Sequence, residues 1–142
     1  MLETLASVLS SLVIVLNQLS AVVAQMPVVQ AANNPIKEEV IELITNKAEV
    51  HGVNIPLALA LADIESGYNP TAKNPSSTAK GLFQFIDKTW ADLCVGEVFN
   101  PESNTDCAMS LIARGGLHHW TVSTTTREKL IERGVLASTT KP

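Results

Sequence analysis

The feature that most constrains the fold is a short segment that is apolar on every side. Residues 57–62 read Leu-Ala-Leu-Ala-Leu-Ala, and Asn54-Ile55-Pro56 precedes them. An asparagine cap followed by a proline is typical of a helix start, and Gly67 is typical of a helix end. A helix that is apolar all round is normally enclosed by other elements. We therefore predict that residues 55–66 form the central helix of one small domain.

The segments around this helix also have helical patterns. A first helix is predicted over residues 35–51, before Gly52, with one buried face formed by Ile36, Val40, Leu43, Ile44 and Ala48. Residues 68–78 are an irregular loop by composition, and helices follow over residues 83–93, 100–114 and 125–133, the last with a capping box of Thr125 and Glu128. No segment alternates as a strand does, so the predicted fold class is all-α. Residues 135–142 are expected to form a flexible tail.

The N-terminal residues 1–32 have two interpretations. Residues 12–16 form a short apolar block followed by small residues, as in a secretory signal sequence, although Glu3 stands where a positive charge is expected. The apolar residues of positions 5–26 also recur at intervals of three and four, as in an amphipathic helix that lies on a membrane, a partner or the domain itself. We expect an extracytoplasmic protein (secreted, periplasmic or bound to the wall or membrane), with residues 4–26 as the membrane-associating part.

The two cysteines agree with that location. Cys94 and Cys107 are 13 positions apart, and a disulfide across this interval would restrict the unfolded chain by roughly 3 kcal/mol. Disulfides persist in oxidising compartments. The alternative is two separate buried thiols, because free cysteine is a common small core residue.

Glu65 is the first candidate for catalysis. It lies in the last turn of the most apolar predicted helix, on the same face as Ala58, Leu61 and Ala62. Desolvation raises the pKa of a carboxyl, and the negative end of the helix dipole acts in the same direction. Both effects favour the protonated form near neutral pH, which a general acid needs. If the helix end emerges into solvent, Glu65 is an ordinary surface residue. Asp63 lies on the opposite side of the helix and is not a second carboxylate for the same ligand.

Two motifs resemble those of lytic transglycosylases with a lysozyme-like domain, known as the soluble lytic transglycosylase (SLT) domain. Residues 64–70, Ile-Glu-Ser-Gly-Tyr-Asn-Pro, are similar to the Glu-Ser motif of that family. Residues 79–85, Ala-Lys-Gly-Leu-Phe-Gln-Phe, followed by Thr89-Trp90, are similar to its Gly-Leu-x-Gln motif. The order and spacing match, and the resemblance covers roughly residues 53–120. It implies a lysozyme-like helical domain, which we place over residues 33–134.

The resemblance implies cleavage of the β-1,4 bond between N-acetylmuramic acid and N-acetylglucosamine in peptidoglycan. Glu65 would protonate the leaving oxygen and then act as base, and groups of the substrate would replace an enzyme nucleophile and water to give a 1,6-anhydromuramyl product. The residues implied to bind substrate are Ser66, Gly81, Phe83, Gln84 and Trp90. For Gly81 simple turn geometry is the alternative, and for Phe83, Phe85 and Trp90 it is packing in the core.

The expected partners follow from the charge pattern as well as from the resemblance. The net charge is -4 and no Lys/Arg cluster is present, which argues against nucleic acid. The resemblance implies glycan strands as partner, and we expect a monomer without metal or cofactor.

The sequence departs from the family at two points, of which Phe83, where the family commonly has Met, is a modest change. No tyrosine follows Tyr68, so the family tyrosine that hydrogen-bonds the catalytic glutamate has no match. The segment Gly115-Gly116-Leu117-His118-His119-Trp120 stands in its place, and its last three residues are candidates to replace the tyrosine. Four loop acids, Asp87, Asp92, Glu97 and Glu102, are further carboxylates that the fold could bring close.

Three other functions stay open because of that departure and the N-terminal pattern. They are a glycan-binding module without activity, a lysozyme-type hydrolase, and a helical interaction protein assembled through residues 5–26.

Overall fold

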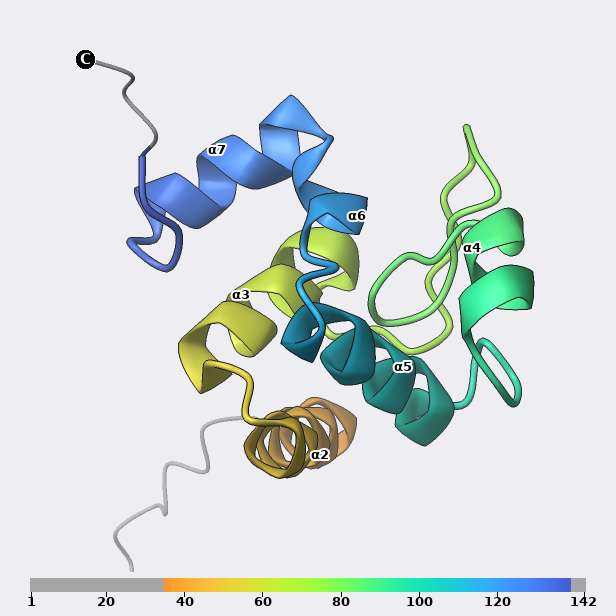
Figure 1. Ribbon diagram of the computed structural model, residues 1–142. Coiled ribbons are helices and arrows are strands. Elements are labelled where there is room, and N and C mark those ends of the chain that lie inside the picture. The colour runs from red at the N-terminus through yellow and green to blue at the C-terminus, as the bar shows by residue number, and fades with distance from the viewer. Residues whose placement is uncertain (1–34, 139–142) are drawn as a thin grey trace, which may run out of the picture. The chain divides into compact units, whose positions relative to one another are not determined.

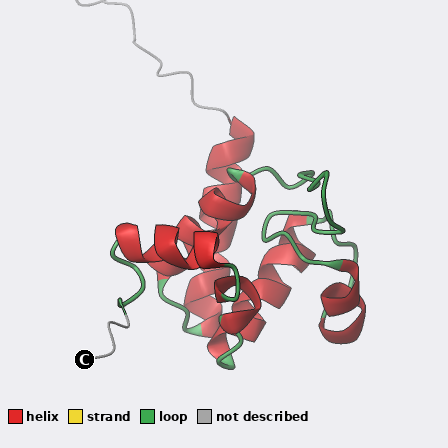
Figure 2. Cartoon of the chain, turned by 90° about the horizontal axis from the view of Figure 1, so that it is seen from above, coloured by secondary structure: helices red, strands yellow, loops and turns green. Residues whose placement is uncertain are grey.

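The computed structural model describes residues 35–138, in which helices joined by loops are the only regular elements (Figures 1 and 2). The helices are α2 (Pro35–His51), α3 (Ile55–Ser66), α4 (Asp87–Leu93), α5 (Pro101–Ala113), α6 (His118–Thr121) and α7 (Thr124–Glu132). The predicted all-α class is confirmed. The predictions made for residues 1–32 lie outside the described residues.

Helix α3 is the central helix, as the sequence predicts. The Asn54 side chain accepts a hydrogen bond from the Leu57 backbone N–H at 2.9 Å, and Gly67 ends the helix in the left-handed conformation with φ of 61°. Ala58, Leu61 and Ala62 have no exposed surface. Helix α3 packs against α2 and α7, and α2 also packs against α5. Glu65, in the last turn of α3, is therefore carried by a helix that packs against two others.

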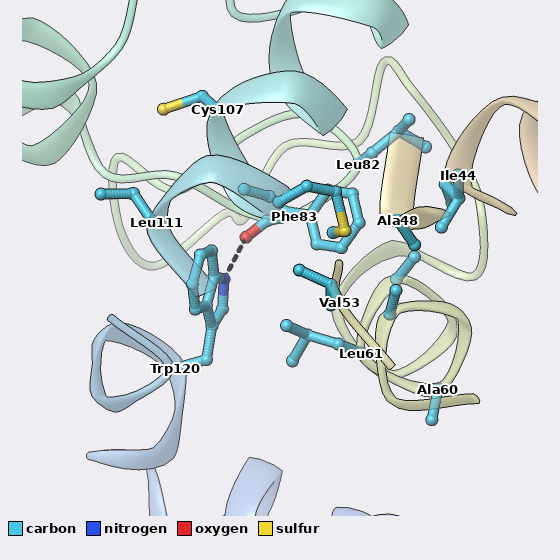
Figure 3. Close-up of a cluster of buried hydrophobic side chains, with 14 of the residues drawn as sticks. Ile44, Ala48, Val53, Ala60, Leu61, Leu82, Phe83, Cys107, Leu111 and Trp120 are labelled. Carbon is cyan, nitrogen blue, oxygen red and sulfur yellow. Dashed lines mark hydrogen bonds between the residues drawn. The ribbon is translucent and has the colours of Figure 1, made fainter. Parts of the chain in front are cut away.

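One hydrophobic core joins these helices to the loop that follows α3 (Figure 3). Helix α2 contributes Val40, Ile44 and Ala48, spaced at four residues as a buried stripe requires. Ile36, which was expected on the same face, is 59% exposed because it lies in the first turn of α2. Leu82 and Phe83 of the loop are fully buried in this core, so the loop is anchored from inside.

Two helix starts differ from the sequence prediction. The helix expected over residues 83–93 begins only at Asp87, because Lys80 and Phe85 exchange two backbone hydrogen bonds of 3.1 and 3.0 Å around a tight turn. Helix α7 is capped by Ser123, whose side chain accepts from the Thr126 N–H, and not by Thr125. The first shift places Phe83 and Gln84 on a turn, where side chains do not follow helical spacing.

A disulfide and two apolar residues fasten parts of the chain after α3. Cys94 and Cys107 form a disulfide that joins the end of α4 to α5, so the alternative of two separate thiols is wrong. Val135 and Leu136 fall in the segment expected to be flexible, yet both N–H groups donate to the Leu130 carbonyl and both side chains pack against the core. Apolar burial at these two positions outweighs the polar composition of the rest of the segment.

Candidate active site

Glu65 lies at the end of α3, one turn after the fully buried Leu61, and its side chain is half-buried. A residue four positions on shares the same helix face, so the carboxyl projects from the margin of the core. The hydroxyl of the next residue, Ser66, donates to the Ala62 carbonyl at 3.1 Å. The Ser66 side chain is therefore turned back on the helix backbone and does not bond to Glu65.

The partner of Glu65 is Thr126 on α7. The Thr126 hydroxyl donates to Glu65 Oε1 at 3.0 Å, and Thr126 is 7% exposed. Burial raises the pKa of the Glu65 carboxyl by desolvation, while the Thr126 hydrogen bond and the Lys129 ammonium lower it, and the desolvation effect is the largest. The pKa is raised overall, which favours the protonated carboxyl that a general acid needs.

Gln84 lies on the tight turn after Gly81, in the left-handed conformation with φ of 51°. Its Nε2 donates to the Gly81 carbonyl at 2.9 Å and to the Ala72 carbonyl at 3.4 Å. Both amide protons are thus engaged in holding the turn, and the Oε1 acceptor is the part of the amide left for a ligand. A ligand group that meets this amide must be a hydrogen-bond donor.

Asn104 of α5 holds the same turn through hydrogen bonds of its side chain. Its Oδ1 accepts from the Phe83 N–H at 2.9 Å and its Nδ2 donates to the Val98 carbonyl at 2.7 Å, with no exposed surface on Asn104. Gly81, with φ of 79°, lies directly against this side chain, so that a Cβ atom built there would overlap Asn104 and Val98. The close approach that needs a glycine at position 81 is therefore to α5.

The aromatic residues divide between core and surface. Phe83 has no exposed surface, so the structure does not support a direct contact of its ring with substrate. Trp120 is buried as well, and its Nε1 donates to the Phe83 carbonyl at 2.7 Å (Figure 3). Trp90 is half-buried beside Phe85, with ring centroids 5.3 Å apart, and donates to the Gly96 carbonyl at 3.2 Å.

A cavity of about 360 Å³ lies next to the Gln84 turn. Its lining comes from the segment after the turn and from α6 with the residue that follows, namely Gln84, Phe85, Ile86, Thr89, His118, His119, Trp120 and Val122. Figure 1 shows α6 facing the loop that carries the turn. The cavity is large enough for a small ligand, and its walls are more apolar than charged.

Within residues 35–138, the Glu65 carboxyl has no hydrogen bond with either of the two histidines or with the four loop acids. The rings of His118 and His119 are exposed and 4.4 Å apart at their centroids, and burial together with the His118 charge lowers the pKa of His119. Asp87 pairs with Lys80 and Asp92 with Lys88, so these carboxylates already have cationic partners. In residues 35–138 no three His, Cys, Asp or Glu side chains gather as metal ligands do.

Comparison with known proteins supplies the family. Residues 42–116 match the family described as "Transglycosylase SLT domain". The chain belongs to this family. The matched range of the SLT domain runs from the middle of α2 to the end of α5 and includes Glu65, the Gln84 turn and Asn104. It ends before α6 and α7, where the sequence departs from the family motifs.

Relatives with a name are similar to the chain over a comparable length. The chain is 36% identical over 84 residues to the probable transglycosylase SceD of Staphylococcus aureus strain Newman, which covers 54% of this chain and 36% of that protein. The corresponding protein of strain Mu3 is 37% identical over 81 residues, or 51% of this chain and 35% of the relative. The match thus spans about a third of the length of these curated relatives. No solved structure is significantly similar to the chain.

Two residues of the site were missed by the motif analysis of the SLT domain. Asn104 shares a helix face with Cys107, Ala108 and Leu111, which are buried, so its position on an apolar face was a usable signal. Thr126 lies four residues before the buried Leu130 and was overlooked because Thr125 was assigned as the helix cap. Neither signal indicates which distant group the side chain contacts.

Proposed function

We propose that this chain is a peptidoglycan lytic transglycosylase whose catalytic domain spans residues 33–134. Glu65 is its single acid and base. The observation that carries the proposal is the half-buried Glu65 carboxyl with a raised pKa, at the end of an apolar helix in an SLT domain. The raised pKa favours the protonated carboxyl, which is the form that a general acid needs.

The proposed reaction needs no second carboxylate. Glu65 donates its proton to the glycosidic oxygen as the bond from C1 of N-acetylmuramic acid to O4 of N-acetylglucosamine breaks. The Glu65 carboxylate then accepts the proton of the muramic O6 hydroxyl as O6 bonds to C1, which yields the 1,6-anhydro ring and restores the acid. No water is consumed, and Asp63 is directed to Arg133 at 2.8 Å, in agreement with a one-carboxylate mechanism.

Substrate binding is assigned to the turn and the adjoining cavity. The Gln84 Oε1 accepts from a hydroxyl or an acetamido N–H of the glycan, because the two amide protons of Gln84 are engaged within the turn. Trp90 lies near the cavity through its contact with Phe85. Gly81 and Ser66 contribute by shaping the turn and the helix end, and Phe83 contributes through its backbone carbonyl.

We further propose an extracytoplasmic location, where peptidoglycan is found. The Cys94–Cys107 disulfide supports it, since such bonds persist in oxidising compartments. None of the helices within residues 35–138 is long and apolar enough to cross a membrane. A signal sequence or membrane-associating helix in residues 4–26 therefore stays a prediction from the sequence.

Product analysis tests the function. Purified protein incubated with sacculi is expected to release 1,6-anhydromuropeptides, identified by mass spectrometry, and Glu65→Gln is expected to release none. Glu49→Gln, the same chemical change at an exposed position of α2, serves as the matched control and should keep full activity. Reducing muramic ends would identify a hydrolase. Binding to sacculi without soluble product would identify a binding module, and either result would overturn the proposal.

A further inference from the structure

The hydrogen bond between Thr126 and Glu65 joins residues that are 61 positions apart. Two further contacts hold helix α7, which carries this hydroxyl. The Thr126 N–H donates to Ser123 Oγ at 3.4 Å at the start of α7, and Arg133 at the other end of α7 pairs with Asp63 of α3 at 2.8 Å. The cap fixes the first turn of α7, the ion pair fastens the far end of α7 to α3, and the two helices pack against each other, so the backbone that carries the Thr126 hydroxyl is held beside Glu65.

The hydrogen bond makes the two oxygens of Glu65 inequivalent. Oε1 accepts the Thr126 proton, whereas Oε2 takes no hydrogen bond from any side chain or backbone group within residues 35–138. In a protonated carboxyl only one oxygen carries the hydrogen, and an oxygen that already accepts a hydrogen bond is the poorer place for it. The transferable proton therefore belongs on Oε2.

The other candidates for this role are His118, His119 and Trp120, and each of them makes a different contact. The Trp120 indole N–H is committed to the Phe83 carbonyl at 2.7 Å. His118 contacts the Gly115 carbonyl through Nδ1, and His119 stacks on His118 at the exposed side of the cavity. Of the groups in residues 35–138, Thr126 is the one that bonds to the Glu65 carboxyl.

We propose that Thr126 is a positioning residue of the active site, which holds Oε1 of Glu65 and leaves Oε2 to deliver the proton and to take it back. After proton transfer the carboxylate gains a charge-assisted hydrogen bond from the same hydroxyl, which stabilises the state that must act as base. This inference rests on the proposed function, because it assigns a part of the Glu65 reaction. It does not depend on which glycan occupies the cavity.

The test compares three variants by steady-state release of anhydromuropeptides. Thr126→Val removes the hydroxyl, Thr126→Ser keeps it, and Thr105→Val makes the same change at a fully buried threonine of α5 whose hydroxyl has no partner within the described residues. We expect Thr126→Val to lower kcat by about 10- to 100-fold, the range that one hydrogen bond to a charged group corresponds to, with KM nearly unchanged. Thr126→Ser should regain most of the rate, and Thr105→Val should keep it.

The pH profile separates positioning from a merely structural role. The Thr126 hydrogen bond lowers the pKa of Glu65, so its removal should raise that pKa and move the loss of kcat at alkaline pH to higher pH. Thr126→Ser and Thr105→Val should keep the alkaline limb of the wild-type pH profile, which is the fall of kcat at high pH. If Thr126→Val fails to fold, Thr126→Ala replaces it in the same comparison.

The two proposals fail in distinguishable ways. Unchanged kcat and an unchanged alkaline limb in Thr126→Val, together with an inactive Glu65→Gln, overturn the role of Thr126 and leave the transglycosylase function in place. Full activity in Glu65→Gln overturns the function itself.

Discussion

Replacement of Gly81 by alanine tests whether the Gln84 turn is held by its contact with α5. Two effects are expected at this position. The backbone has φ of 79°, which an alanine adopts only with strain, and the new Cβ would lie 2.6 Å from the Val98 carbonyl oxygen and would overlap the Asn104 amide. Asn104 is fully buried and bonded at both ends, so it cannot move aside without loss of its hydrogen bonds to Phe83 and Val98.

Gly52 provides the matched control for the backbone strain. It has φ of 67°, and a Cβ there meets nothing within 4 Å. The strain of a non-glycine residue at positive φ is about 1–2 kcal/mol, and both variants carry it. Overlap in a packed core adds about 1–3 kcal/mol, and each buried polar group that loses its partner adds about 1–3 kcal/mol. Gly81→Ala should therefore cost at least about 2 kcal/mol more than Gly52→Ala.

Urea unfolding followed by tryptophan fluorescence measures the difference, because Trp120 reports on the core beside the turn. For a domain of this size, about 2 kcal/mol corresponds to a shift of roughly 8–16 °C in Tm, which calorimetry resolves. Gly81→Ala should also lose the proposed transglycosylase activity at temperatures where it is folded, since the Gln84 turn is displaced. Equal losses of stability in the two variants would refute the reasoning, because the contact with Asn104 would then carry no energy.

Two further predictions concern the stability of the domain. Burial raises the folded-state pKa of Glu65 above its unfolded value, so the contribution of this residue to stability is present below the unfolded pKa and is lost as the pH rises through the folded pKa. In urea titrations, Glu65→Gln should therefore be more stable than wild type at pH 8 and differ little from it at pH 4. A wild type that is the more stable protein at pH 8 would contradict the desolvation of Glu65. Replacement of both Cys94 and Cys107 by serine should lower the free energy of unfolding by about 2–4 kcal/mol, and reductant should lower the free energy of unfolding of wild type equally. A loss below about 1 kcal/mol would show that the closed loop adds little constraint.

The contacts that complete the site differ in how far the sequence predicts them. The Glu65 position follows from local rules, because the cap at Asn54, the apolar run and Gly67 act within one helix. The Gln84 turn does not follow, since the pattern of residues 83–93 is compatible with a helix until Phe85 pairs with Lys80. The burial of Phe83 depends on Asn104 and Trp120, which lie 21 and 37 positions further along the chain.

The sequence by itself determined the all-α class, the central helix and the order of the two motifs, because capping, helical periodicity and glycine ends depend on neighbouring residues. Only the tertiary structure decided that a threonine on α7 meets the Glu65 carboxyl, that an asparagine on α5 supports the Gln84 turn, and that Phe83 belongs to the core. The physical reason is that these contacts join side chains far apart in the chain. Their partners are selected by helix packing, which no local pattern specifies.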